Sequence, residues 1–306
     1  MLDRYVAAME QSIAHWGNTL ATAADTVYLG GGTPSLLGGN RIARLIEAVD
    51  RAFPLTADAE ITMEANPADE LFDTLCAFRA AGGNRLSLGM QTACDSELAD
   101  LGRRHRADQT ARAVESARRA GIDNLSLDLM LALANQTVGH IDRSVEACRA
   151  LGASHVSAYL LKIEPNTAFG ACVPAGLPDE DGAADLYLHA CRALENAGYR
   201  QYEISNFARD GKHSRHNLKY WNGDDYLGLG PAAHSLIGGK RFSYPRDLMG
   251  FIDGNEPTAQ DSEPLAGSPE EYAILRLRLT EGLTEDGFQQ KFGRPIPPKW
   301  RENAHK

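Results

Sequence analysis

The chain has 306 residues, of which 43% are hydrophobic and 24% charged, and its formal net charge is −10. This composition is typical of a globular protein with a substantial core. The acidic balance argues against a nucleic-acid partner, because the only basic cluster is the short run 103–106. No apolar run reaches the ~20 residues that span a bilayer, and the first residues lack a secretory signal. We therefore expect a cytoplasmic protein without a transmembrane segment.

Strand-like and helix-like segments alternate through the first two thirds of the chain. Leu2, Val6, Met9 and Ile13 recur at helical spacing and predict a first helix. The expected strands are 26–29, 60–64, 85–90, 124–130 and 155–161. The expected helices between and after them are 42–49, 71–81, 108–120 and 140–151. Such repeated strand–helix units indicate an α/β fold with a parallel sheet and right-handed crossovers.

The pattern changes after about Pro165. A helix is predicted for 179–197, followed by a β-rich segment at 199–204 and an aromatic stretch with histidines at 213–234. The last fifty residues are rich in Pro, Gly and Glu and show one helix candidate, 272–279. They contain no internal repeat.

Polar residues at the strand ends help to choose between two architectures. A closed or partial β/α barrel and a doubly wound sheet both fit the alternation. Glu64, Gln91 and Asp128 each fall at the C-terminal end of a different predicted strand, where barrel enzymes place ligand-binding groups. Each could singly cap a helix or loop. Three polar groups on one rim favour a barrel with a ligand site.

A glycine run, Gly30-Gly31-Gly32-Thr33-Pro34, follows the first predicted strand. Taken alone, it favours a tight turn over close backbone approach to a ligand. It matches neither GxGxxG nor a P-loop, so nucleotide-phosphate binding is poorly supported.

Five blocks in chain order resemble the radical S-adenosylmethionine (SAM) family, and within it the branch of HemW heme chaperones and oxygen-independent coproporphyrinogen III oxidases. The blocks are Tyr28–Leu37, Ile61–Pro67, Leu98–His105, Ile163–Thr167 and Tyr202–Ala208. The resemblance implies a partial (β/α)6 barrel at 1–205 with its first strand missing. It further implies that 206–306 begin an incomplete C-terminal accessory domain, so that the chain is shortened at both ends relative to the family.

By this resemblance, Gly30, Gly31, Gly32 and Thr33 hold the methionine end of SAM, and four further residues contact SAM. These four are Glu64, Gln91, Arg103 and Asp128. Without the resemblance, Arg103 is interpreted as an ordinary solvated helix residue.

The segment His216-Asn217-Leu218-Lys219-Tyr220-Trp221 fits the HNxxYW pattern of the heme chaperone branch. The resemblance implies that His216 ligates heme iron and that Tyr220 and Trp221 cover the porphyrin, because neutral imidazole binds heme iron and aromatic rings pack on its face. In an arbitrary sequence the same residues would form a packed corner. His234 is a second candidate.

Family members also carry CxxxCxxC, whose thiolates bind a [4Fe–4S] cluster. The five cysteines here are far apart, and no pair has the spacing of a cluster loop, a zinc knuckle or a redox pair. They are Cys76, Cys94, Cys148, Cys172 and Cys191. We expect the cluster ligands to be missing and radical chemistry to be absent from this chain. Ala132 and Ala232 stand where the family favours Gly, and Ala132 would crowd its turn if φ is positive.

Three functions are compatible with these features. The first, which we expect, is a chaperone that binds heme and delivers it to an acceptor hemoprotein. The second is a radical SAM enzyme that oxidises coproporphyrinogen III, which requires the cluster. The third is a nonfunctional fragment or an unrelated β/α domain.

Overall fold

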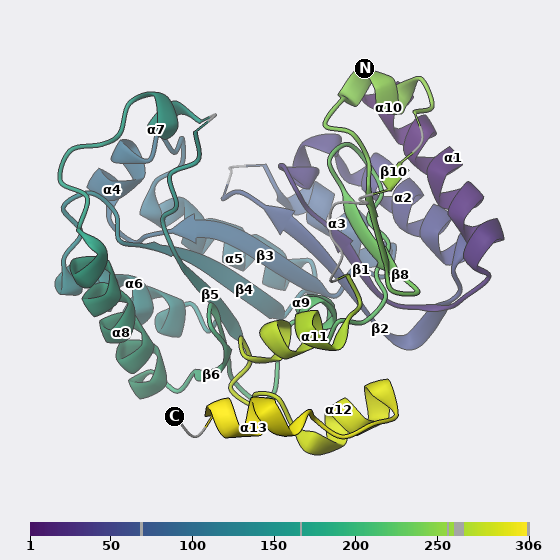
Figure 1. Cartoon of the computed structure of the whole chain (residues 1–306). Coiled ribbons are helices and arrows are strands. Elements are labelled where there is room, and N and C mark those ends of the chain that lie inside the picture. Colours follow the sequence, from purple (N-terminus) through teal and green to yellow (C-terminus); the bar gives the residue numbers. More distant parts are fainter. Residues whose placement is uncertain (68–69, 166, 256, 260–265, 305–306) are drawn as a thin grey trace.

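The computed structural model describes residues 1–67, 70–165, 167–255, 257–259 and 266–304. Its central layer is a curled seven-stranded sheet of order β1-β2-β3-β4-β5-β7-β6 (Figure 1). The strands are β1 (Ala24–Leu29), β2 (Leu55–Ala65), β3 (Arg85–Gln91), β4 (Asn124–Leu131), β5 (His155–Leu160), β6 (Arg200–Glu203) and β7 (Asn206–Ala208). Strands β1 to β5 are parallel, whereas β7 is antiparallel to both β5 and β6. The five predicted parallel strands are therefore confirmed. Asn166, in the fourth sequence block, lies outside the described residues.

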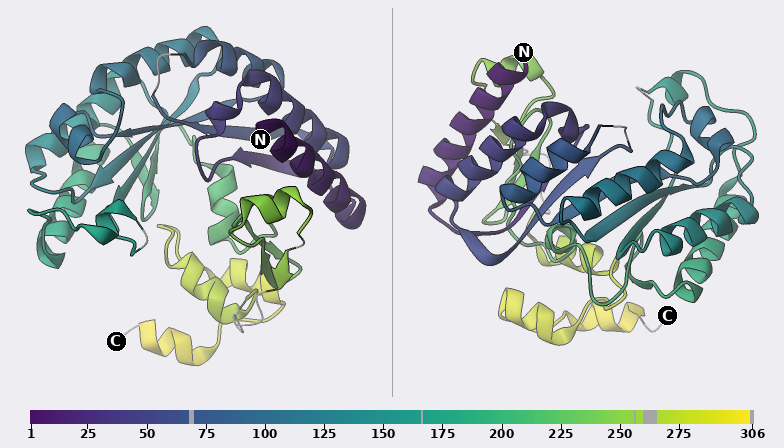
Figure 2. Two further views of the ribbon diagram at one scale, coloured as in Figure 1. Left: turned by 90° about the horizontal axis from the view of Figure 1, so that it is seen from above. Right: turned by 180° about the vertical axis from the view of Figure 1, so that it is seen from behind.

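Long helices cover the convex side of this sheet, which is seen from above in Figure 2. They are α1 (Leu2–Leu20), α2 (Gly39–Ala52), α3 (Phe72–Ala80), α5 (Ala107–Arg119), α6 (Val138–Ala150) and α8 (Glu180–Asn196). Shorter elements, η1 (Pro34–Leu37), α4 (Asp95–Asp100) and α7 (Ala168–Ala171), occupy the connections. A doubly wound sheet carries long helices on both faces. The partial barrel is therefore confirmed, and the doubly wound alternative is wrong.

The two faces of the sheet differ in chemistry because side chains alternate along each strand. Apolar side chains point to the convex face and form the main core with the helices. They include Ile61, Met63, Leu86, Leu88, Leu125, Leu127, Leu129, Val156 and Ala158. The intervening positions point to the concave face and are mostly polar.

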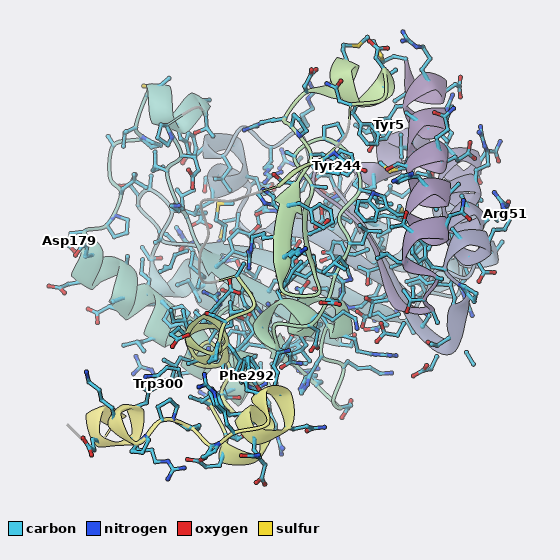
Figure 3. The ribbon with its side chains drawn as sticks, turned by 45° about the vertical axis from the view of Figure 1, so that its right-hand side comes forward. Tyr5, Arg51, Asp179, Tyr244, Phe292 and Trp300 are labelled. Carbon is cyan, nitrogen blue, oxygen red and sulfur yellow. The ribbon has the colours of Figure 1, made fainter. Side chains whose placement is uncertain are left out.

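The C-terminal third adds a small sheet of order β10-β9-β8 beside α1. Its strands are β8 (His234–Ile237), β9 (Lys240–Ser243) and β10 (Thr258–Ala259). The hydroxyl of Tyr244 accepts a hydrogen bond from Trp16 Nε1 at 3.0 Å, and Trp16 stacks on Phe242. Figure 3 shows Tyr244 next to Tyr5 of α1. The small sheet and α1 therefore share a second core.

Five helices complete the described chain: α9 (Arg215–Trp221), α10 (Leu248–Ile252), α11 (Pro269–Arg276), α12 (Glu285–Phe292) and α13 (Pro298–Ala304). Tyr272, Phe288 and Ile296 form a third core, onto which Phe292 and Trp300 pack (Figure 3). The expectation of one helix in the last fifty residues is wrong, because α12 and α13 are too short to show a clear helical period. Among the described residues, no helix has the length and apolar character needed to cross a membrane.

Candidate functional site

The predicted ligand groups gather on the concave face of the half-barrel. Strand register places Glu64 of β2 beside Ser87 of β3, and Asp128 of β4 beside Ser157 of β5. Because all these strands are parallel, their polar side chains form continuous rows across the sheet. The rows line one surface that faces the C-terminal elements.

The glycine turn contacts this surface through Glu64. The N–H of Gly31 donates to Glu64 Oε2 at 3.2 Å, and the hydroxyl of Tyr28 donates to Glu64 Oε1 at 3.0 Å. A Cβ on Gly30 would lie 2.7 Å from Tyr28 Cε1 and 2.9 Å from Glu64 Cδ. Gly31, with φ of +86°, and Gly32 face open space instead. The turn thus needs Gly30 for packing and leaves the next two residues accessible to a ligand.

Thr33 closes the turn. Its hydroxyl accepts a hydrogen bond from Asn66 Nδ2 at 3.1 Å, which ties the turn to the segment that follows β2. Thr33 therefore serves the shape of the loop in this structure.

Asp128 lies deeper than the sequence indicated. It is three residues before the end of β4, where its Oδ1 accepts a hydrogen bond from Ser87 at 3.0 Å. Burial raises the pKa of Asp128 to about 6, against the hydrogen bonds from Ser87 and Ser157, and the charge of Glu64 adds to the rise. This carboxyl group therefore changes charge close to neutral pH.

Gln91 and Arg103 meet at the rim around Tyr159. Gln91 ends β3 with φ of +66°, and its Oε1 accepts a hydrogen bond from the Tyr159 hydroxyl at 3.2 Å. Burial, with the charge of Asp128, raises the pKa of Tyr159 to about 12, and the charge of Arg103 opposes this rise. Arg103 lies in the loop between α4 and α5, so its interpretation as a helix residue is wrong.

Arg85 of β3 lies beneath these groups. Only 1% of its surface is exposed, and its Nε has no hydrogen-bond partner among the residues that the structure describes. Its positive charge lowers the pKa values of Tyr28, Asp128 and His216. For Tyr28 and Asp128, burial has a larger effect in the opposite direction. The buried guanidinium therefore opposes part of the rise in the pKa of Asp128.

His216 is held at the edge of the same surface by α9. Glu60 accepts the backbone N–H groups of Arg215 and His216, at 3.2 and 3.0 Å, and so binds the first turn of the helix. The ring Nδ1 lies 2.9 Å from Thr26 Oγ1, and Nε2 lies 2.9 Å from the Tyr220 hydroxyl. Burial lowers the pKa of His216 to about 4, so the ring is neutral at physiological pH.

The structure brings His216, Tyr220 and Trp221 together, with the Tyr220 and Trp221 ring centroids 6.4 Å apart, but places His234 elsewhere. The ring of Trp221 packs under the guanidinium of Arg278, whose Cζ lies 4.2 Å from the ring centroid. His234 begins β8 in the small sheet and is exposed. Tyr226 instead packs edge-on against Tyr220, with ring centroids 4.6 Å apart.

Tyr28 joins the two predicted sites. Its hydroxyl binds Glu64, and its ring stacks on His216 with centroids 5.0 Å apart. Tyr28, Glu60, Arg85 and Tyr159 had no assigned role in the sequence analysis. The available signal was polar residues at alternate positions of strands that should otherwise be buried, for example Arg85 and Ser87 in β3.

The described residues fit SAM but not a [4Fe–4S] cluster. Open space at Gly31 and Gly32, with the carboxylates of Glu64 and Asp128 nearby, suits a ligand that carries amino and hydroxyl donors. All five cysteines lie in the described part of the chain, and no three of them come together there.

Comparison with known proteins identifies the family. Residues 13–148 match the radical SAM superfamily model. The chain is 35% identical to the heme chaperone HemW of Bacillus subtilis over 314 residues, covering 96% of this chain and 80% of the relative. It is 38% identical to HemW of Escherichia coli over 268 residues, covering 86% and 71%.

A solved structure agrees with the fold. The radical SAM enzyme coproporphyrinogen III oxidase (HemN) of Escherichia coli superposes with a TM-score of 0.81 at 24% identity, covering 99% of this chain and 75% of that one. At this identity the likeness concerns the fold alone. The two HemW relatives exceed 30% identity over most of both chains, and this chain therefore belongs to the HemW family of the radical SAM superfamily.

Proposed function

We propose that this protein binds heme as cargo and delivers it to an acceptor hemoprotein in the cytoplasm, with His216 as the iron ligand. The observation that carries the proposal is the neutral, half-buried imidazole of His216 among the rings of Tyr28 and Tyr220. Neutral imidazole is the form that binds heme iron. The names of the two HemW relatives support the same function.

Ligation through His216 requires one of its ring nitrogens to be released. In the proposed arrangement, Nδ1–H donates to Thr26 and fixes the ring, while Nε2 exchanges the Tyr220 hydroxyl for iron. A hydrogen bond on the far nitrogen orients metal-bound histidines in the same way. The exchange gives up one hydrogen bond, which costs about 1 kcal/mol. Tyr220 lies one helical turn after His216, so a side-chain rotation is sufficient.

We also propose that Gly30 to Thr33, Glu64, Gln91, Arg103 and Asp128 form a SAM site. When bound, SAM supplies a sulfonium cation next to amino acid and adenosine groups. Glu64 and Asp128 would accept hydrogen bonds from its donors, and Arg103 would face its carboxylate. SAM should then raise the melting temperature of the wild-type protein and raise it less in Gln91→Ala, since ligand binding to the folded state stabilises it.

The test of the heme proposal is a heme titration followed by absorbance. Wild type should give a saturable Soret shift that His216→Ala loses and that His189→Ala keeps. His189 is a matched control because it lies in α8 and pairs with Asp142, away from the concave face. Loss of the shift in His234→Ala but not in His216→Ala would assign iron to the small sheet. No saturable shift in the wild type would favour a protein without heme function.

The oxidase alternative has no such support. The likeness to HemN establishes a fold, and no described group supplies the cluster that the reaction needs. Our proposal therefore does not include an enzymatic activity.

A further inference from the structure

Three metal-ligating side chains converge outside the concave face, where the connection that follows β3 packs against the start of α6. The donor atoms of Cys94, Glu97 and His140 all lie within 4.8 Å of one another. Cys94 and Glu97 are 4% and 3% exposed, whereas the side chain of His140 is 30% exposed. The group is thus buried on two sides and open to solvent through the imidazole.

Two hydroxyl groups build the scaffold around these donors. Thr92 accepts the backbone N–H of Cys94 at 3.1 Å and donates to Glu97 Oε2. Ser144 accepts the backbone N–H of Ala93 at 3.0 Å and donates to the carbonyl of His140 at 2.9 Å. The loop before α4 is therefore fastened to the first turn of α6. Hydrogen bonds that fix ligand side chains in this way are typical of metal sites.

The ligand atoms of Glu97 and His140 that are not held by Thr92 or Ser144 face each other. Because Thr92 occupies Oε2 of Glu97, the other oxygen, Oε1, faces His140 Nδ1 at 2.8 Å. In a tetrahedral zinc site, bond lengths of 2.0–2.3 Å place ligand atoms roughly 3.3–3.6 Å apart. Small side-chain rotations would bring all three donors to that spacing.

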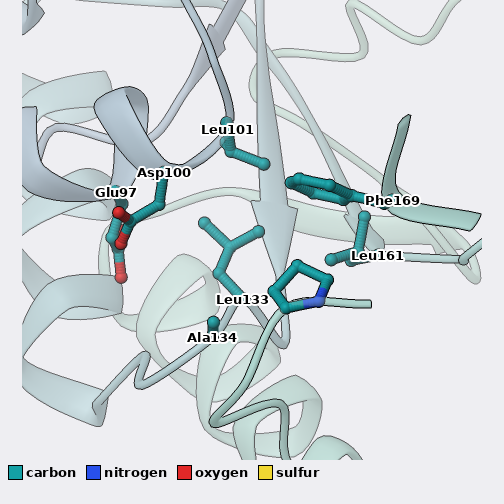
Figure 4. Close-up of a pocket in the computed structure, with 8 residues that line it drawn as sticks. Glu97, Asp100, Leu101, Leu133, Ala134, Leu161 and Phe169 are labelled. Carbon is teal, nitrogen blue, oxygen red and sulfur yellow. The ribbon is translucent and has the colours of Figure 1, made fainter. Parts of the chain in front are cut away.

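A thiolate, an imidazole and a carboxylate are the donors that Zn²⁺ takes in proteins, whereas Mg²⁺ and Ca²⁺ prefer oxygen alone. A hollow of about 20 Å³ adjoins Glu97, but neither Cys94 nor His140 lines it, so a water ligand would approach from the solvent side of His140. Figure 4 shows the carboxylates of Glu97 and Asp100 at one end of this hollow, with apolar side chains at the other. We propose that Cys94, Glu97 and His140 bind Zn²⁺, with water as the fourth ligand.

Arg143 supplies a distinguishing feature of this site. Its Nη1 lies 3.3 Å from Cys94 Sγ. Arg143 itself is exposed to solvent. A guanidinium at this distance opposes a divalent cation, and it can turn towards solvent when the ion enters. Arg143→Met should therefore bind the metal more tightly than the wild type. A purely structural hydrogen bond to sulfur would give no such gain.

The site connects to the concave face through the backbone. Gln91 immediately precedes Thr92, so an ion that fixes the Thr92–Glu97 loop also fixes the end of β3. The proposal does not depend on heme binding, and metal affinity should be unchanged in His216→Ala.

The experiment is a Co²⁺ titration of chelator-treated, heme-free protein, followed through the thiolate-to-cobalt charge-transfer band. Wild type should bind one equivalent, and Zn²⁺ should displace it. Cys94→Ala and His140→Ala should each lose the band. Cys191→Ala and His189→Ala, which change the same residue types elsewhere, should retain it. Thr92→Val should weaken binding about 10–100-fold, because it releases Glu97 Oε2.

Two results would overturn the proposal: no saturable band in the wild type, or a band that survives both Cys94→Ala and His140→Ala. Weaker binding in Arg143→Met would also contradict it. Far-ultraviolet circular dichroism should show native helix content in His140→Ala, because this side chain is partly exposed. If Cys94→Ala fails to fold, the His140→Ala titration decides alone.

Discussion

The imidazole of His216 lies against the phenol ring of Tyr28, with an angle of 27° between the ring planes. The hydroxyl of Tyr28 also donates to Glu64, which in turn accepts the N–H of Gly31. One side chain therefore contacts both Glu64 of the proposed SAM site and the proposed iron ligand. The contact joins α9 to β1 and shields part of the imidazole from solvent. This partial burial lowers the pKa of His216 and favours the neutral ring.

Heme ligation through His216 should be nearly independent of pH between 5.5 and 8. Burial lowers the pKa of His216 to about 4, so the ring is neutral throughout this range. A histidine with an ordinary pKa of about 6.5 would lose roughly tenfold in affinity at pH 5.5, because most of it would be protonated. Heme titrations at both pH values measure the difference. A tenfold loss at pH 5.5 would show that the ligand is not this buried ring.

Tyr220→Phe should raise heme affinity about fivefold. The substitution removes the hydroxyl that competes for His216 Nε2 and keeps the ring that packs on Tyr226. A hydrogen bond of about 1 kcal/mol corresponds to that factor. Titration of the variant beside wild type checks the value. Weaker binding would mean that the hydroxyl itself contacts heme.

Asp128→Asn should stabilise the protein at pH 8 by about 2 kcal/mol. The folded pKa of Asp128 is raised to about 6, so the folded state holds its proton longer than the unfolded chain. The ionised carboxyl therefore costs stability that appears as pH rises from about 4 to 6 and is fully present above 6. Urea unfolding of both proteins at pH 8 measures the gain.

At pH 4.5 most of this gain should be absent, because folded Asp128 is then protonated in the wild type as well. Asp123→Asn is the matched control, since Asp123 is exposed in the turn before β4. An equal gain at both pH values would show that the effect of Asp128→Asn is unrelated to ionisation.

Gly30→Ala should destabilise the fold by about 1–3 kcal/mol, while Gly32→Ala should change stability by less than about 0.5 kcal/mol. The methyl group on residue 30 would overlap the Tyr28 ring and Glu64, but that on residue 32 meets nothing within 4 Å. Thermal unfolding of the pair tests this. Since Gly32 faces open space, any loss of SAM binding in Gly32→Ala reports contact with the ligand itself.

Ala132→Gly and Ala232→Gly should each stabilise the protein by about 0.5–1 kcal/mol. Their φ angles are +60° and +61°, a region that costs a non-glycine residue roughly 1–2 kcal/mol. Glycine removes this cost, but its larger conformational entropy in the unfolded chain cancels part of the gain. Ala111→Gly, at an exposed position within α5, should destabilise by about 1 kcal/mol. Chemical denaturation gives all three values, and equal signs would contradict this account.

The sequence predicted the parallel part of the fold because each strand and helix there has a clear period. The condition stated for Ala132 is met, because its φ is +60°. The short elements α4, α7, α12 and α13 were not predicted, because each offers few apolar positions from which a helical period can be recognised. Their boundaries depend on side-chain caps such as Thr284.

The site was predictable in composition but not in geometry. Glu64, Gln91 and Asp128 could be placed on one surface, because parallel strands share an end. The contact of Tyr28 with His216 could not be predicted, since it joins residues that are far apart in the sequence. The convergence of Cys94, Glu97 and His140 depends on packing between α4 and α6, which has no signature in residue spacing.

Side chains alternate between the two faces along each strand, so odd and even residues have different surroundings. In β2 and β4 the even positions face inwards and the odd ones lie in the core, whereas in β3 and β5 the parity is reversed. A saturation mutagenesis scan of these strands should therefore yield a striped pattern. Substitutions at core-facing positions would lower the expression level, and substitutions at inward-facing positions would change ligand recognition. Because the second set lies outside the apolar core, its more exposed members can acquire new specificity while the scaffold remains the same.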